Sequence, residues 1–519
     1  MVFLLPLPPM SKLLEISDLS LDLKQDGQWK SILHHINFSI GRGETLGIVG
    51  ESGSGKSVTA LSVMQLLKEN QSRYPSGQIL FYDNEEHPTN IINCSEQKMR
   101  QLRGNRIAMI FQEPMTSLNP VLKCGEQITE QILLHTNATK EDAQKQVIEL
   151  FKEVMLPRPE QIFNAYPHEI SGGQKQRVMI AMAMSCQPDL LIADEPTTAL
   201  DVTVQKGILE LIKWLQAKHG MSVLFITHDL GVVAEIADKV LVLYKGNVVE
   251  HDNIRNIFLS PKHPYTQGLL ACRPSLTERL KRLPTVDDFI QGKEQQLSSL
   301  SITAEEREAE HKRIYVQNPL IEIENLNKLY PVRKQKLFEK RQYVHALQNI
   351  NLTVYEGETL GLVGESGCGK TTLGRSMIRL IEPTSGIIRY QGKSLTELNA
   401  NQMRRMRKDL QIILQDPYSS LNQKLTIGDA LMEPMKVHGI GSNDRERKER
   451  ALALLERVSL NESHFYAWND KWVMPESYQV VDSSSVEIKN FLLEHEGQFF
   501  AANGVISENP DDRFTIKSH

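Results

Sequence analysis

The chain has 519 residues, of which 40% are hydrophobic and 24% are charged. This length predicts about three domains at ~100–200 residues each, and the composition is that of an ordinary globular protein. Its 59 basic and 64 acidic residues give a net charge of −5, which does not predict a general nucleic-acid-binding surface. The five cysteines are scattered without a C-x-x-C pair, which excludes a disulfide framework and indicates a reducing compartment. No apolar run reaches the ~18–20 residues of a membrane-spanning helix.

The first ten residues, MVFLLPLPPM, are apolar but short and interrupted by proline, so they do not predict a signal peptide. Met10 is followed by Ser11 and Lys12 and is a better protein start. We therefore place the first domain from residue 11, and residues 1–9 are either translated or an upstream miscall of the start.

One long internal repeat divides the sequence. Residues 43–57 read GETLGIVGESGSGKS and residues 357–371 read GETLGLVGESGCGKT, so the two copies are 314 residues apart (357 − 43). FQEPMTSLNP at 111–120 is likewise repeated as LQDPYSSLNQ at 414–423. A period this long indicates a duplicated domain and excludes a solenoid, whose repeats span about 20–50 residues.

The first motif in chain order is a glycine-rich loop that fits G-x-x-x-x-G-K-[ST]. It follows a strand-like run at 46–49 and precedes a helical pattern at 58–67. Glycines let backbone N–H groups turn toward phosphate oxygens, and the helix N-terminus adds a partial positive charge. The lysine reaches the β- and γ-phosphates, and the last hydroxyl ligates Mg²⁺. This predicted phosphate loop consists of Gly50, Glu51, Ser52, Gly53, Ser54, Gly55, Lys56 and Ser57.

Three further apolar, strand-like runs end in polar residues, where open α/β sheets bind ligands. They are residues 107–111 before Gln112, 190–193 before Asp194 and Glu195, and 223–226 before Thr227 and His228. We expect Asp194 to hold Mg²⁺ through water, Glu195 to polarise the attacking water, and His228 to contact the γ-phosphate. Gln112 is expected to ligate Mg²⁺ or water and to report the nucleotide state to a partner. For each run taken alone, a solvated strand end or a structural histidine is the competing interpretation.

Residues 170–174 read ISGGQ and open another helical pattern. Its serine and two glycines predict a second anion-binding helix N-terminus, formed by Ser171, Gly172, Gly173 and Gln174. Because the domain already has a phosphate loop, a second phosphate cradle predicts a nucleotide held between two domains.

This combination of motifs resembles the ATP-binding cassette (ABC) family. The phosphate loop, glutamine loop, ISGGQ signature, LLIADEP strand, TTALD loop and histidine switch all occur within residues 11–250, in the family's order. FQEPMTSLNP, YPHEISGGQ and HPYTQGLL look like the ATPase subunits of bacterial dipeptide, oligopeptide and nickel importers, and the two-cassette layout is most similar to glutathione importers. The resemblance implies an α/β P-loop NTPase fold of ABC type, with a mixed or parallel sheet core and a helical subdomain. It also implies that Asp201 crosses to the partner domain.

The resemblance further implies an ATPase that uses ATP and Mg²⁺ to drive import of a dipeptide, an oligopeptide or glutathione across the bacterial inner membrane. The implied partners are two membrane-spanning permease subunits, a periplasmic or surface solute-binding protein, and a second copy of the chain or another ATPase subunit. The implied location is the cytoplasmic face of that membrane. A soluble twin-cassette ATPase of translation or DNA repair is the alternative, but the mixed-charge linker and the lack of zinc-binding cysteine pairs favour the importer.

The second copy repeats only part of the pattern. Its predicted nucleotide-binding residues are Gly364, Glu365, Ser366, Gly367, Cys368, Gly369, Lys370, Thr371 and the adenine-stacking Tyr330, with Thr371 and Gln415 as Mg²⁺ ligands. At the place of Tyr330 the first copy has Leu23, which has no aromatic ring to stack on adenine. The spacing in the first copy places the second signature near residue 474, where the sequence instead reads AWNDKWVMPESYQVV.

We therefore predict five segments, namely a complete nucleotide-binding domain at 11–255, an importer-type extension at 256–290, a linker at 291–318, a partial nucleotide-binding domain at 319–464 and an unrelated, aromatic-rich tail at 465–519. In a head-to-tail cassette dimer, each ATP lies between the phosphate loop of one domain and the signature of the other. We accordingly expect no complete hydrolytic site within one chain. A truncated copy that binds ATP without completing hydrolysis alone is a further alternative.

Overall fold

The structure, a computed structural model, describes residues 11–25, 27–83, 88–112, 117–198, 200–273, 279–293, 301–331, 342–365, 367–414, 421–422, 424–458 and 460–466, and four short strands further on. These residues fall into two units, the first mostly from residues 29–313 and the second mostly from residues 314–362 and 368–519. Each unit is described by itself below.

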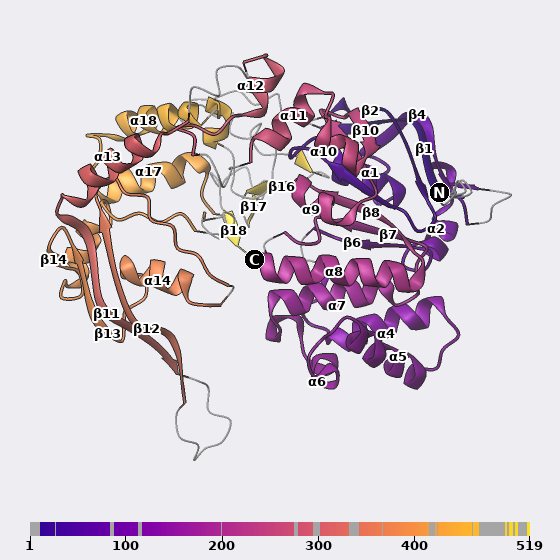
Figure 1. Cartoon of the computed structure of the whole chain (residues 1–519), viewed down its shortest axis with the longest axis horizontal. Helices are drawn as coiled ribbons and strands as arrows, with labels where there is room; N and C mark the ends of the chain where they lie inside the picture. The colour runs from indigo at the N-terminus through magenta and orange to yellow at the C-terminus, as the bar shows by residue number, and fades with distance from the viewer. Residues whose placement is uncertain are drawn as a thin grey trace, which may run out of the picture. The chain divides into compact units, whose positions relative to one another are not determined.

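Short apolar runs of the first unit form a six-stranded sheet with the order β10-β9-β3-β8-β7-β6 (Figure 1). Its strands are β3 Thr45–Val49, β6 Ile107–Ile110, β7 Leu190–Asp194, β8 Ser222–Thr227, β9 Lys239–Tyr244 and β10 Asn247–Asn253. All neighbours pair in parallel except β10, which is antiparallel to β9. Every residue of β3, β7 and β8 is buried, as expected for parallel strands covered on both faces.

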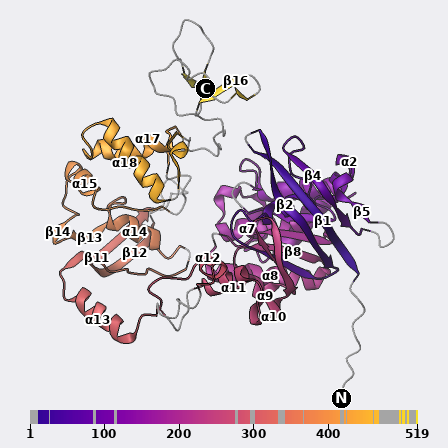
Figure 2. The same ribbon diagram turned by 90° about the horizontal axis from the view of Figure 1, so that it is seen from above.

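An antiparallel sheet covers one face of this core and has the order β2-β1-β4-β5 (Figure 2). Its strands are β1 Lys12–Gln25, β2 Gln28–Gly41, β4 Ser72–Phe81 and β5 Thr89–Asn90. Leu14 and Phe81 are paired across β1 and β4, and both are fully buried. They share one hydrophobic cluster with Ile48 and Ile226 of the central sheet, so the two sheets pack face to face.

Helices complete the first unit. The helices around the central sheet are α1 Lys56–Val63, α2 Glu96–Leu102, α8 Val202–His219, α9 Leu230–Ile236 and α10 Ile254–Leu259. A helical group packs on α8 and consists of α4 Cys124–His135, α5 Lys140–Glu153, α6 Pro159–Asn164 and α7 Gly172–Met184 (Figure 1). After the sheet come α11 Pro264–Ala271, α12 Val286–Ile290 and the polar, exposed α13 Ala304–Tyr315.

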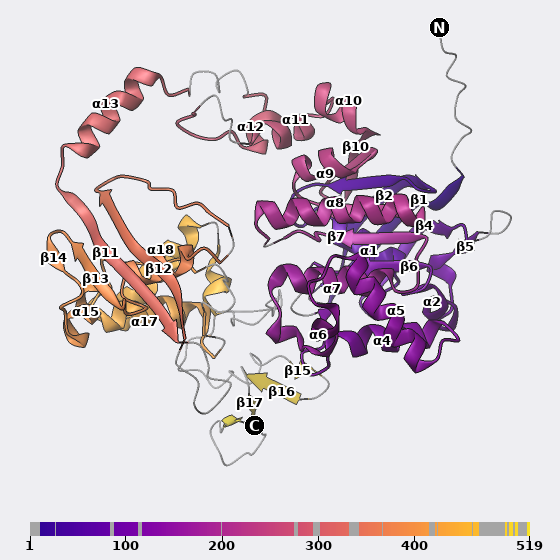
Figure 3. The same ribbon diagram turned by 60° about the horizontal axis from the view of Figure 1, so that its bottom comes forward.

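The second unit repeats the antiparallel sheet, here with the order β12-β11-β13-β14 (Figure 3). Its strands are β11 Pro319–Pro331, β12 Tyr343–Tyr355, β13 Ser385–Tyr390 and β14 Lys393–Ser394. Its helices are α14 Lys370–Met377, α15 Ala400–Met406, α17 Ile427–Val437 and α18 Asp444–Arg457. Four short strands then pair in sequence, namely β15 Glu494–His495, β16 Gln498–Ala501, β17 Gly504–Ile506 and β18 Ile516–Ser518.

The parallel core is not repeated among the described residues of the second unit. Residues 359–363, equivalent to β3, and 411–414, equivalent to the end of β6, form no strand. Val363 is 89% exposed whereas its counterpart Val49 is fully buried. The same apolar letters thus lie in a core in one copy and at the surface in the other.

The strand-like runs at 46–49, 107–111, 190–193 and 223–226 are confirmed as β3, β6, β7 and β8. The helix expected at 58–67 begins two residues earlier and ends at Val63, because Met64 caps it and Gln65 takes a left-handed φ of 47°. Within the described ranges, no helix is both long enough and apolar enough to cross a membrane.

Candidate nucleotide site

The loop between β3 and α1 has the backbone geometry of a phosphate cradle. Gly50, Gly53 and Gly55 have φ values of 157°, 79° and 106°, in the region that favours glycine. A Cβ at position 50 would collide with the carbonyl oxygen of Leu243, and one at position 55 would lie 2.6 Å from Leu33 Cδ2. The space above Gly53 is open, so the loop is closed on the protein side and open where a ligand would enter.

Lys56 lies across this loop and is 5% exposed. Its Nζ donates hydrogen bonds to the carbonyl oxygens of Gly50 and Glu51, both at 2.8 Å. Burial lowers the pKa of Lys56, and the charges of Glu195 and Asp194 partly oppose that shift. A buried ammonium held by neutral carbonyl groups suits a strongly anionic ligand such as a phosphate.

Ser54 lies on the closed side of the loop. Its Oγ is buried and has no hydrogen-bond partner among the described residues. A Cβ on Gly50 would lie 2.7 Å from this Oγ and would also meet the Leu243 carbonyl oxygen, so the hydroxyl is on the protein side of the loop.

Ser57, the last residue of the phosphate loop, and Asp194 form a hydrogen-bonded pair that joins two elements. Ser57, in α1, donates a hydrogen bond of 3.1 Å to Asp194 Oδ1 at the end of β7. Burial raises the pKa of Asp194, the Ser57 hydrogen bond lowers it, and the charge of Glu195 raises it again. No cluster of three or more His, Cys, Asp or Glu side chains placed to hold a metal occurs in the part of the chain described. One hydroxyl and one carboxylate nevertheless suit Mg²⁺, which keeps waters and phosphate oxygens as its other ligands.

Two other predicted residues, His228 and Gln112, contact Glu195, together with Thr198. Its Oε1 lies 3.1 Å from His228 Nδ1, and its Oε2 accepts hydrogen bonds from Gln112 Nε2 at 3.2 Å and Thr198 Oγ1 at 2.9 Å. Burial alone would raise the pKa of Glu195, but the hydrogen bonds from His228 and Thr198 outweigh it and lower that pKa. The carboxylate is therefore kept ionised, as a group that polarises water must be.

The backbone of Glu195 is also constrained. Its φ is 47°, which is uncommon for a residue with a side chain, and its N–H donates to the carbonyl oxygen of Ile226 at 2.9 Å. This strained turn directs the chain out of β7. The contact from Thr198 was not predicted from the sequence, where a threonine three residues after the acid gives only a weak signal.

The ISGGQ segment begins α7 through a reciprocal cap. Ser171 Oγ accepts from the N–H of Gln174 at 3.3 Å, and Gln174 Oε1 accepts from the N–H of Ser171 at 2.9 Å. A Cβ on Gly173 would lie 3.1 Å from Val204, in the first turn of α8. Asp201 caps α8 by accepting from the N–H of Val204, so the signature and the loop aspartate adjoin each other.

The second glycine loop has the same backbone. Gly364, Gly367 and Gly369 have φ values of 154°, 82° and 103°. Lys370 opens α14, and its Nζ lies 3.7 Å from Cys368 Sγ. Glu365 follows Gly364, and the exposed Thr371 follows Lys370. Ser366 and Gln415 lie outside the described residues. Tyr330 is 38% exposed, with the amine of Lys328 5.1 Å from its ring centre.

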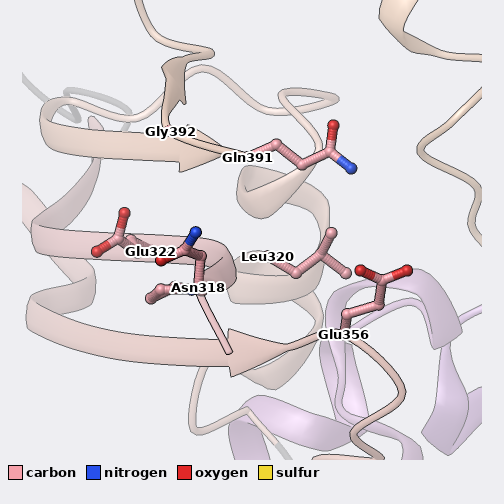
Figure 4. A pocket seen from close by; sticks show the side chains of 7 residues that line it. Asn318, Leu320, Glu322, Glu356, Gln391 and Gly392 are labelled. Atoms are coloured by element: carbon pink, nitrogen blue, oxygen red, sulfur yellow. The ribbon is translucent and has the colours of Figure 1, made fainter. Parts of the chain in front are cut away.

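A cavity of 440 Å³ in the second unit has no residue of this loop in its lining (Figure 4). Its lining includes Asn318, Leu320, Glu322, Glu356 and Gln391. Two carboxylates and no basic side chain line it, so it does not suit a nucleotide.

The fold and the loop geometry define a P-loop nucleotide-binding ATPase cassette. The family described as "ABC transporter" matches residues 33–198 and 347–475. The chain belongs to the ABC transporter family, and its fold is the ATPase cassette of that family.

Two curated relatives are glutathione import ATP-binding proteins GsiA. The protein of Salmonella choleraesuis (strain SC-B67) is 45% identical over 456 residues, which is 88% of this chain and 72% of the relative. That of Escherichia coli O157:H7 is 46% identical over 459 residues, with the same coverage of both chains. A solved ATP-binding cassette dimer bound to ADP and Pi is 27% identical, with a TM-score of 0.42, and the match covers 47% of this chain and 99% of that one.

Proposed function

We propose that this chain is the ATP-hydrolysing subunit of an importer for glutathione or a related short peptide. The observation that carries the proposal is the convergence of Lys56, the Ser57–Asp194 pair and Glu195 at the ends of β3 and β7. Parallel strands present their carboxyl ends at one edge of a sheet, where α/β proteins bind ligands. The names of the two GsiA relatives, glutathione import ATP-binding proteins, support glutathione as the solute class.

The roles follow from the contacts. Lys56 exchanges the two loop carbonyls for phosphate oxygens. Ser57 and Asp194 would hold Mg²⁺, which would supply positive charge to the transferring phosphoryl group. Glu195 accepts hydrogen bonding from the attacking water and orients it. His228 and Gln112 each contact one oxygen of that carboxylate. Either residue can therefore shift when the γ-phosphate is bound or released, and so couple the nucleotide state to the rest of the protein.

We also propose that the signature acts on a nucleotide held by another cassette. Ser171 is exposed at the start of α7, and Asp201 adjoins it at the start of α8. A second copy of the chain, or another ATPase subunit, would pair its phosphate loop with this surface. Lys370 and Thr371 of the second loop are proposed to bind a further ATP with Mg²⁺.

The permease subunits are proposed to dock beside the glutamine loop, at the cytoplasmic face of the plasma membrane. A cavity of 290 Å³ there is lined mainly by apolar side chains, including Met109, Phe111, Met179 and Met182. Phe111 is 40% exposed and directly precedes Gln112. Flexible methionines beside an exposed aromatic suit an apolar helix from a membrane partner.

The test measures ATP hydrolysis and the identity of the transported solute separately. Purified chain should release phosphate from ATP in a manner that depends on Lys56 and Glu195. In E. coli cells that lack GsiA, the wild-type chain should restore uptake of radiolabelled glutathione while Glu195→Gln should not. If the chain hydrolyses ATP and supports uptake of dipeptides but not of glutathione, the proposed solute is wrong and the proposed ATPase function stands.

A further inference from the structure

The helix that follows the cassette contacts the phosphate loop directly. Tyr265, the second residue of α11, is fully buried, and its Oη accepts a hydrogen bond of 2.8 Å from the N–H of Glu51. The two residues are 214 positions apart in the sequence. Burial raises the pKa of Tyr265 to about 12, so the phenol stays neutral at physiological pH.

This contact fixes one end of a single peptide group. The N–H of Glu51 and the carbonyl of Gly50 belong to the same peptide bond, and the carbonyl accepts from Lys56 at 2.8 Å. Tyr265 therefore holds the plane of the peptide on which Lys56 rests. When Lys56 moves to a phosphate, the tyrosine remains to keep that peptide in place.

Tyr265 is itself held rigidly. His263 Nδ1 caps α11 by accepting from the N–H of Tyr265 at 3.1 Å, and Glu250 of β10 accepts from the N–H groups of Lys262 and His263. The ring packs on Tyr244, with 4.2 Å between ring centres. It shares a hydrophobic cluster with Val49, the last residue before the phosphate loop.

The same segment also contacts the histidine loop. Arg273, two residues beyond α11, forms an ion pair with Asp229, which directly follows His228. Asp229 in turn caps α9 by accepting from the N–H of Gly231 at 2.8 Å. One short segment, residues 264–273, is thus bonded to two loops of the nucleotide site.

We propose that residues 264–273 position the phosphate loop and the histidine loop for ATP, with Tyr265 as the positioning residue of the first and Arg273 of the second. This rests on the proposed ATPase function. A phenylalanine would fill the same core space as Tyr265, so only the acceptor for the Glu51 N–H distinguishes the two residues. Loss of that acceptor leaves the Glu51 N–H without its partner on Tyr265 and frees the peptide to turn.

The test uses the full chain in a Lys370→Ala background, which removes the second loop's lysine from the measurement. The affinity for the fluorescent nucleotide MANT-ATP and the KM and kcat for ATP are measured for Tyr265→Phe. Tyr244→Phe is the matched control, because Tyr244 belongs to the same aromatic pair but its hydroxyl contacts Lys245 rather than the loop. We expect Tyr265→Phe to weaken MANT-ATP binding and raise KM about fivefold, and Tyr244→Phe to change them by less than about twofold.

Arg273→Gln gives an independent readout, since Arg273 is partly exposed and its replacement does not disturb the core. We expect its kcat to fall about fivefold with KM within about twofold, the opposite split to Tyr265→Phe. Unchanged binding and KM in a folded Tyr265→Phe chain would overturn the role of Tyr265. If Tyr265→Phe does not fold, an unchanged kcat in Arg273→Gln would overturn the proposal. Absence of Lys56-dependent binding in the Lys370→Ala parent would instead refute the ATPase function itself.

Discussion

Ser57 donates a hydrogen bond of 3.1 Å to Asp194, although the two residues are 137 positions apart in the chain. The contact joins the first turn of α1 to the last residue of β7. It places the two proposed oxygen ligands of Mg²⁺ side by side before any ion arrives. Their positions can therefore be tested in the protein alone and in the presence of nucleotide.

Asp194→Asn is expected to stabilise the nucleotide-free chain at pH 7. Asp194 has a folded-state pKa above its ordinary value of 3.8, so the folded form loses stability as pH rises through that pKa. Removing the charge should raise the Tm of the first unit by about 2–4 °C at pH 7, with the gain disappearing below about pH 4. Calorimetry across this pH range measures it, with Asn at the exposed Asp142 as the control. A lower Tm at pH 7 would contradict the pKa direction.

Glu195→Gln is expected to abolish turnover while preserving binding. Without the carboxylate, water is no longer polarised, so phosphate release should fall about 10²- to 10⁴-fold. MANT-ATP should still bind, since Lys56 and the loop are intact. Glu210→Gln, an exposed acid paired only loosely with Lys206, should behave as wild type. Near-normal phosphate release would assign the water to another residue.

Two inactive variants are expected to complement each other. Ser171→Arg places a bulky side chain in the signature, and Lys56→Ala removes the lysine proposed to bind the phosphates. Neither variant alone should therefore hydrolyse ATP. In an equal mixture, half of the pairs carry one intact phosphate loop facing one intact signature, which gives about one quarter of wild-type activity. Phosphate release across a range of protein concentrations measures this. A mixture as inactive as its parts would argue against pairing of two copies through the first cassette.

Equivalent valines in the two copies are expected to differ in their effect on stability. Val49→Ala creates a cavity in a fully buried strand and should lower the free energy of unfolding by about 2 kcal/mol. Val363→Ala, at a position 89% exposed, should change it by less than about 0.5 kcal/mol. Urea unfolding followed by circular dichroism compares them. Equal losses would mean that Val363 is covered in solution.

This pair of valines also shows the limit of prediction from sequence. Continuous apolar runs such as 190–193 predicted buried strands correctly, because parallel strands covered on both faces leave no polar alternation. The near-identical runs at 45–49 and 359–363 nevertheless have different structures, since β3 is a strand only with β8 and β9 beside it. Strand formation depends on neighbours that a local pattern does not contain.

The site was predictable to a similar degree. Lys56, Asp194 and Glu195 stand in recognisable motifs at the ends of strands, so their grouping follows from the topology. The hydrogen bonds from Thr198 to Glu195 and from Glu51 to Tyr265 do not follow from it. They depend on the packing of side chains from segments whose separation in the sequence carries no signal.

The reciprocal cap at the start of α7 has a consequence for selectivity. Ser171 Oγ already accepts the N–H of Gln174, so one lone pair is engaged and the hydroxyl proton points elsewhere. The O–H of Ser171 therefore remains to donate a hydrogen bond to a bound molecule, while one of its two lone pairs remains to accept. The helix N-terminus adds partial positive charge, so this end of α7 favours ligands rich in acceptor oxygens over ligands that carry mainly N–H or O–H donors.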